Sequence, residues 1–114
     1  MQKIKRPKVL QGISREVKVG CGSLYVTMGA MDGKIIEVIA ILGKAGGCAI
    51  AQNEALGRAI SLGLRYGVPL SEYIEQLKDI RCPSPHMFPR EEMCLSCADG
   101  FAIALRENGF EKIS

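Results

Sequence analysis

The sequence predicts an α+β domain, a three-stranded antiparallel meander followed by three helices packed against it. Two observations support this. Apolar residues alternate with polar ones in the first part of the 114-residue chain, which is typical of half-buried strands, and recur at helical spacing in the second part. Strands grouped before helices favour an α+β plan over one in which the two alternate along the chain.

Composition limits the class of protein. The length suits one domain, and a hydrophobic share of 47% excludes a disordered or fibrous chain. No stretch reaches the ~18 apolar residues of a membrane span, and no apolar block of signal-peptide length follows the basic N-terminus. We therefore expect a cytoplasmic protein without a large cofactor cavity of its own. A net charge of +3 does not by itself indicate a nucleic-acid partner.

We divide the chain into a basic N-terminal tail or edge segment, residues 1–15, and a single domain, residues 16–114. Within the domain, Val17 and Val19 alternate with charged residues, and a second alternating run covers residues 23–28. A turn at Asp32-Gly33 precedes residues 35–42, whose nearly uninterrupted β-branched run predicts a buried central strand.

Three helices are expected after residue 47. The first runs from about Cys48 to Tyr66. Its stripe of large apolar residues is Leu56, Ile60 and Leu64. A neighbouring stripe of small residues contains Ala51, Ala55, Ala59 and Gly63. The opposite side, which we expect to face solvent, carries Glu54, Arg58, Ser61 and Arg65. The second contains Leu70, Tyr73, Ile74, Leu77 and Ile80. The third begins at Ser96-Cys97-Ala98-Asp99, where the Ser96 hydroxyl would accept from the Asp99 amide, and it ends at Asn108-Gly109.

Four of the five cysteines fall at the ends of predicted elements: Cys21, Cys48, Cys82 and Cys97. An odd count without a secretory signal argues against a disulfide scaffold and favours metal binding or redox chemistry. The positive end of a helix favours thiolate over thiol, so we expect Cys48 and Cys97 to feel that field.

The residues alone leave several functions open. One zinc site would use the four element-end cysteines, and a local one would use Cys82, His86, Cys94 and Cys97, whose spacing suits compact zinc modules. Reduced cysteines without metal are the simplest alternative. Cys94 and Cys97 could also form a redox dithiol, and the 43–47 loop before a helix could seat a nucleotide or nucleic acid. With six aromatic residues, base stacking has little support.

Several ordered blocks resemble the TSCPD domain, which occurs at the C-terminus of adenosylcobalamin-dependent ribonucleotide reductases and as small four-cysteine proteins. The resemblance runs from Arg6 to about Leu105 and includes Gly20-Cys21-Gly22-Ser23-Leu24-Tyr25-Val26-Thr27, Leu42-Gly43-Lys44-Ala45-Gly46-Gly47-Cys48 and Ile80-Arg81-Cys82-Pro83. The family signature Thr-Ser-Cys-Pro-Asp stands here as Leu95-Ser96-Cys97-Ala98-Asp99, so the threonine and the proline are replaced.

The resemblance implies which cysteines matter. Cys21, Cys48, Cys82 and Cys97 match the family's four, whereas Cys94 and His86 lie outside its pattern. It therefore favours zinc on the first set, in a non-catalytic accessory domain linked to deoxyribonucleotide synthesis and partnered by a reductase catalytic chain. The reductases' catalytic barrel is absent from this chain, so we do not expect it to reduce nucleotides or to bind adenosylcobalamin alone.

Overall fold

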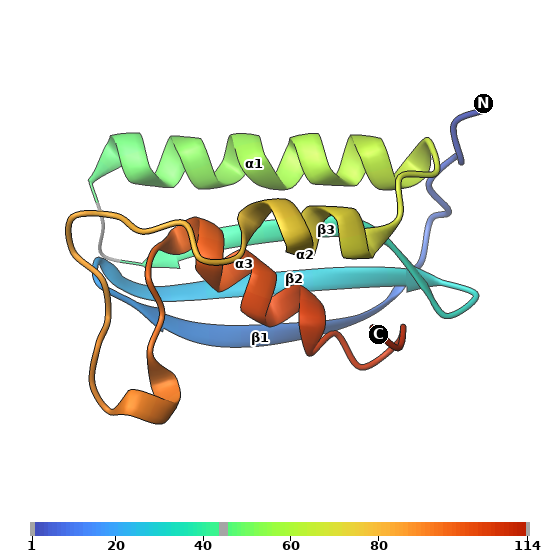
Figure 1. Cartoon of the computed structure of the whole chain (residues 1–114). Coiled ribbons are helices and arrows are strands. Elements are labelled where there is room, and N and C mark those ends of the chain that lie inside the picture. The colour runs from blue at the N-terminus through green and yellow to red at the C-terminus, as the bar shows by residue number, and fades with distance from the viewer. Residues whose placement is uncertain (1, 44–45, 114) are drawn as a thin grey trace.

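The computed structural model describes residues 2–43 and 46–113. Its strands are β1 (Gln11–Val19), β2 (Gly22–Met31) and β3 (Lys34–Gly43), and its helices are α1 (Gly47–Arg65), α2 (Leu70–Leu77), the short 3-10 turn η1 (Arg90–Glu92) and α3 (Cys97–Arg106). The three strands form one antiparallel sheet in the order β1-β2-β3, and the predicted α+β class is confirmed (Figure 1).

Tight hairpins join the strands. Asp32 and Gly33 connect β2 to β3 with positive φ angles of 53° and 78°, as expected for a two-residue hairpin with an Asp-Gly sequence. A register shift at Gly29/Ala30 places Ile35 opposite Ala30 and leaves Ile36 as an extra residue, so both isoleucines are buried. β1 begins at Gln11, so the last five residues of the predicted N-terminal tail or edge segment, 11–15, belong to an edge strand.

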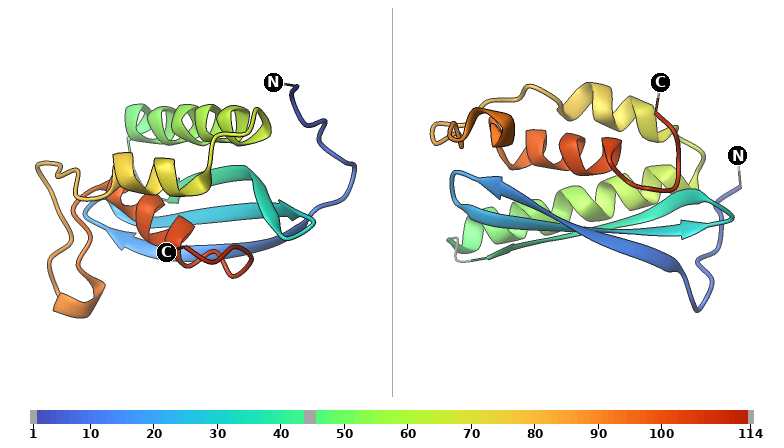
Figure 2. Two further views of the ribbon diagram at one scale, coloured as in Figure 1. Left: turned by 45° about the vertical axis from the view of Figure 1, so that its right-hand side comes forward. Right: turned by 90° about the horizontal axis from the view of Figure 1, so that it is seen from below.

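The core lies between one face of the sheet and the helices. α3 lies over that face against β1 and β2, α2 packs against α3, and α1 runs beside β3 (Figure 2). Strand residues of this face pack with apolar residues of all three helices, including Leu24, Val26, Met28, Val38, Ile60, Leu64, Ile74, Phe101 and Leu105. The opposite face carries Tyr25, Ile39 and Ile41, which are 43%, 49% and 63% exposed. The predicted buried central strand is therefore wrong for β3, which lies at the edge of the sheet and is half exposed.

α1 faces the backbone of β3 at close range. A Cβ added at Gly57 would lie 3.0 Å from the carbonyl oxygen of Val38. Ser61 Oγ accepts from the Val38 N–H at 2.8 Å and lies 3.0 Å from the Val38 carbonyl, to which it can donate. Ser61 is therefore buried, and its predicted solvent exposure is wrong, because a helix beside a strand edge meets hydrogen-bonding backbone.

Two further helical expectations need correction. The small residues Ala51, Ala55 and Ala59 are exposed, because the buried stripe of α1 runs through Asn53, Gly57, Ile60, Ser61 and Leu64. α2 ends at Leu77, and Ile80 lies beyond it and is exposed. The predicted extents of α1 and α3 are confirmed to within one or two residues.

Candidate functional site

Four segments of the chain meet at one end of the molecule. They are the β1–β2 turn, the start of α1, the long connection between α2 and α3, and the start of α3 (Figure 1). β1, β3 and α2 all run towards this end, and α1 and α3 both begin there. These segments carry the four cysteines predicted as ligands, Cys21, Cys48, Cys82 and Cys97. The topology thus gathers element ends that are far apart in sequence.

The turn that carries Cys21 packs directly against the segment that carries Cys82. A Cβ at Gly20 would overlap the carbonyl oxygen of Ser84, so only a glycine allows this approach. The Ser84 N–H in turn donates to Cys82 Sγ at 3.4 Å. Backbone contacts therefore hold these two cysteines on neighbouring segments.

Ser96 and Asp99 position the start of α3. Ser96 Oγ accepts from the Asp99 N–H at 3.0 Å, which confirms the predicted cap, and donates to the Ile80 carbonyl at 2.6 Å. The buried Asp99 carboxylate accepts from the N–H groups of Asp79 and Leu95, each at 2.9 Å. The two side chains therefore tie both ends of the α2–α3 connection to the helix that begins at Cys97.

The role of the Asp99 carboxylate was missed by the sequence reasoning. The Ser-x-x-Asp form predicts a helix start, and a carboxylate in the first turn is favoured there for electrostatic reasons alone. Its partners Asp79 and Leu95 lie outside the helix, and nothing in the local spacing indicates them. One signal in the sequence could have indicated this role: the Ser-x-x-Asp motif directly follows the long, proline-rich connection between α2 and α3, whose ends need to be held.

The Cys97 thiol lies within electrostatic reach of two other cysteines. Burial raises the pKa of Cys97 most, a hydrogen bond with the Asn53 side chain lowers it, and the thiols of Cys21 and Cys82 raise it further. Three of the predicted ligands therefore influence one another across three segments. The upward direction of the Cys97 pKa, with burial as its main cause, is opposite to the thiolate that the helix start is expected to favour.

Cys48 stands apart from this group. It is exposed in the first turn of α1, one residue after the helix begins, and it is not among the groups that shift Cys97. Within residues 2–43 and 46–113, no three or more His, Cys, Asp or Glu side chains are close enough together to hold a metal ion. The donor type suits zinc, and the four-cysteine ligand set stays a prediction.

Cys94 belongs to the core. Its side chain is fully buried, burial raises its pKa to about 11, and Sγ donates to the Ser96 carbonyl at 3.1 Å. Backbone hydrogen bonds at 2.8 Å pair Cys94 with His86, whose buried Nε2 has no partner among the described residues. A redox dithiol of Cys94 and Cys97 needs an accessible thiol of low pKa, and Cys94 has the opposite properties.

The glycine-rich segment before α1 is described only in part. Gly46 is the residue that caps α1, and a Cβ there or at Gly47 would meet no atom within 4 Å. Lys44 and Ala45, on which the predicted nucleotide seat partly depends, lie outside the described residues.

A comparison with protein families shows which family this arrangement belongs to. The family model of the TSCPD domain matches residues 2–108. The chain belongs to the TSCPD domain family. Within this TSCPD domain, the predicted ligands therefore lie in the matched region, and so do the Ser96 and Asp99 side chains that position α3.

Several curated proteins are similar to parts of the TSCPD domain described here. A vitamin B12-dependent ribonucleotide reductase of Agrobacterium fabrum is 40% identical over 72 residues, which is 62% of this chain and 6% of that protein. Proteins of the same name from Streptomyces clavuligerus and Bradyrhizobium diazoefficiens are each 33% identical, over 66% and 62% of this chain and 8% and 6% of their own lengths.

The chain thus spans less than a tenth of the length of these relatives. No solved structure matches it. Among the described helices, none has the length and apolar character needed to cross a membrane.

Proposed function

We propose that this TSCPD domain is a non-catalytic accessory module that binds zinc through Cys21, Cys48, Cys82 and Cys97 and acts with a ribonucleotide reductase in the cytoplasm. The observation that carries the zinc proposal is the direct packing of the Cys21 turn against the Cys82 segment, where a Cβ at Gly20 would overlap the carbonyl oxygen of Ser84. The β1–β2 turn, the α2–α3 connection and the start of α3, which meet at one end of the molecule, each contribute one cysteine of the set, and all five cysteines are free.

Zinc suits this set for chemical reasons. Thiolates are the preferred ligands of structural zinc, and four of them complete a tetrahedral site with no open position for a substrate. Such a site would fasten the β1–β2 turn to both helix starts. Because burial raises the pKa of Cys97, this thiol is protonated at neutral pH, and binding zinc must release its proton. Proton release is therefore a readout that does not depend on any activity.

The zinc proposal is tested by elemental analysis of the protein purified without added metal, followed by chelation and titration with Zn²⁺. We expect about one zinc per chain and proton release on reloading. Cys82→Ala and Cys97→Ala should lose the metal. Cys94→Ala is the matched control, since it makes the same change at a cysteine outside the set and should keep zinc.

Three results would overturn the zinc proposal. The first is wild-type protein that neither retains nor takes up stoichiometric zinc. The second is loss of zinc in both single variants Cys94→Ala and His86→Ala, which would move the site to the alternative set of Cys82, His86, Cys94 and Cys97. The third is full zinc in Cys48→Ala, which would remove the exposed cysteine from the ligands.

The link to a reductase rests on the relatives, all of which are named as B12-dependent ribonucleotide reductases. This domain covers only a small part of such a protein, so we propose that it acts beside a catalytic chain. Sedimentation of the purified domain mixed with a B12-dependent reductase catalytic chain should show a complex. Two species that sediment independently at micromolar concentrations would contradict this part of the proposal.

A further inference from the structure

The outer edge of β1 is open along the strand. β1 lies at one side of the sheet, and among residues 2–43 and 46–113 its backbone hydrogen bonds go only to β2. In an edge strand, alternate residues direct N–H and C=O groups away from the sheet, where another strand can pair with them. The nine residues Gln11–Val19 are long enough to accept such a strand.

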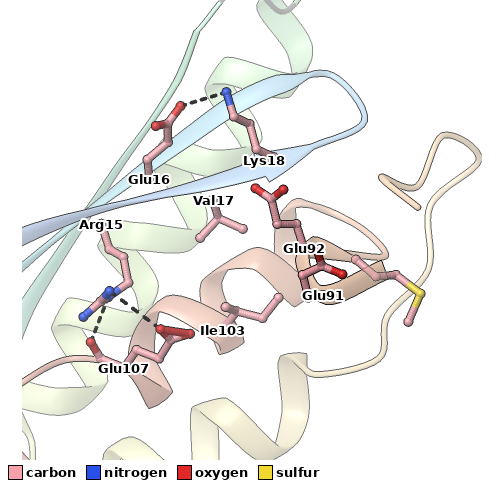
Figure 3. Close-up of a pocket in the computed structure, with 9 residues that line it drawn as sticks. Arg15, Glu16, Val17, Lys18, Glu91, Glu92, Ile103 and Glu107 are labelled. Atoms are coloured by element: carbon pink, nitrogen blue, oxygen red, sulfur yellow. Dashed lines mark hydrogen bonds and ion pairs between the residues drawn. The ribbon is translucent and has the colours of Figure 1, made fainter. Parts of the chain in front are cut away.

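A groove of about 240 Å³ lies beside this edge, between β1, the η1 turn and α3. We call it the β1 groove. Its apolar lining consists of Val17, Met93 and Ile103. Figure 3 shows Val17 on the strand and Ile103 on α3, with Glu91 and Glu92 on the neighbouring turn. A strand added to β1 could therefore place an apolar side chain in the groove while its backbone pairs with the edge.

The lining of the β1 groove carries more negative than positive charge. Arg15 lies 3.6 Å from the Glu107 carboxylate, and Lys18 lies 3.4 Å from that of Glu16, so both basic residues of the lining are paired within it. Glu91 and Glu92 are exposed and form no ion pair with any described residue. The groove thus offers two unpaired carboxylates to an incoming ligand.

We propose that the β1 groove binds an extended basic peptide segment of a partner protein, which adds to β1 as a fourth strand. Backbone pairing supplies the direction and register of binding, and the contacts of alternate side chains supply its selectivity. One side of the peptide is apolar and faces Val17 and Ile103, and its basic residues meet Glu91 and Glu92. This proposal is independent of zinc and of the identity of the reductase.

Other occupants fit less well. A second copy pairing β1 with β1 would bring two η1 turns, each with two unpaired carboxylates, beside one shared edge, and like charges oppose this. The chain's own basic N-terminus is held on the other side of the sheet, where the Ile4 N–H donates to the Arg65 carbonyl at 2.8 Å and Arg6 pairs with Glu37 at 2.7 Å.

The test uses a fluorescein-labelled hexapeptide, Lys-Val-Lys-Val-Lys-Val, and measures its anisotropy as the whole domain is added. We expect saturable binding that weakens several-fold when the salt concentration rises from about 0.02 M to about 0.2 M. Two further peptides carry N-methyl groups on either the valine or the lysine amides. One of them should lose binding and the other keep it, because only alternate amides face the strand.

The contribution of Glu91 and Glu92 is tested with two double variants that remove the same amount of charge. Glu91→Gln with Glu92→Gln should bind the hexapeptide about tenfold more weakly. Glu72→Gln with Glu75→Gln removes the same charge from the exposed side of α2 and should bind it as the wild type does. Circular dichroism of both double variants establishes that they fold.

Each remaining outcome counts against the proposal. Equal binding of all three peptides would mean attraction by charge alone and would overturn strand addition. Equal weakening in both double variants would overturn the β1 groove as the site. Lack of peptide binding at low salt would overturn the partner peptide as the occupant of the groove. A wild-type dimer that dissociates in the Glu91→Gln, Glu92→Gln double variant would also overturn it, and would show that the occupant is another copy of this chain.

Discussion

The two edge strands of the sheet differ in whether other parts of the chain bond to their outer backbone groups. At the β3 edge, backbone groups of the strand bond to side chains from elsewhere in the chain: the Val38 N–H to Ser61 and the Ile35 N–H to Glu111, the latter at 2.6 Å. α1 lies so close to this edge that a Cβ added at Gly57 would stand 3.0 Å from the carbonyl oxygen of Val38. At the β1 edge, the described neighbours leave the backbone unpaired and form a groove beside it.

The difference shows that closing a strand edge needs particular residues and not simply a nearby helix. α3 also packs against β1 in the core, and among the described residues the only side-chain hydrogen bond from that strand towards it is that of Arg15 to the carbonyl of Glu107, just past the end of α3, at 2.9 Å. A small residue for close approach and a hydroxyl or carboxylate to replace a neighbouring strand are found at β3. Four substitutions test this comparison, from the largest expected effect to the smallest.

Replacement of Gly57 by leucine should open the closed edge. The new side chain would press on the Val38 carbonyl and the Ala40 N–H, and the free energy of unfolding should fall by about 3 kcal/mol. Urea denaturation measures this change. Ala59→Leu adds the same leucine to the exposed side of α1 and should cost less than about 0.5 kcal/mol. Equal losses in the two variants would mean that close approach is not what holds α1 to β3.

Asp99→Ala should loosen the connection that borders the open edge. It leaves the Asp79 and Leu95 N–H groups without their acceptor, which should lower the free energy of unfolding by about 2.5 kcal/mol. Hydrogen exchange should become faster across residues 79–96 and stay unchanged in β3. If protection is lost uniformly over the domain, Asp99 supports the whole fold and not this connection alone.

Ser61→Ala removes the hydroxyl that bonds to Val38 at the closed edge. A buried N–H and carbonyl lose their partner, so we expect a loss of about 2 kcal/mol in the free energy of unfolding. The matched change at the open edge is Ser14→Ala on β1, whose hydroxyl is exposed and should contribute less than about 0.5 kcal/mol. Thermal and urea unfolding of both variants compare the edges directly, and similar losses would remove the distinction between them.

Lys18→Val should change stability by less than about 0.5 kcal/mol, because Lys18 is exposed and its one ion pair among the described residues is with Glu16 at 3.4 Å. The expected effect is on self-association, since a charged side chain on an open edge discourages pairing between copies. Light scattering should show larger particles for Lys18→Val than for Lys34→Val, which makes the same change at the start of β3. A monomeric Lys18→Val at high concentration would mean that the β1 edge is already protected.

The sequence predicts the elements better than it predicts their surroundings. The alternation at Val17 and Val19 and the Asp32-Gly33 turn correctly indicate a meander, because strand and hairpin signals are local. Hydrophobic periodicity assigns Ser61 to solvent, since it cannot recognise a helix face that meets the backbone of a strand. The apolar run of β3 on both faces predicts a buried central strand, whereas Ile39 and Ile41 are exposed.

The candidate site shows the same limit. The positions of Cys21, Cys82 and Cys97 at element ends could be predicted from turn and capping signals. The close contact of the Cys21 and Cys82 segments could not, because it depends on how the α2–α3 connection passes Gly20. The burial of Cys94 is also a tertiary property, since its residue spacing equally suits a ligand or a redox thiol.

The bonds of Asp99 have a consequence for how this domain can vary. Asp79 and Leu95 are held to one carboxylate, and His86 pairs with Cys94 a few residues further out, so residues 87–93 form a lobe whose base is already closed. Insertions or deletions in this lobe should leave the sheet and the helices intact. Because Glu91 and Glu92 sit on it beside β1, related chains could change their binding preferences by altering the lobe's length and charge, without any change to the core.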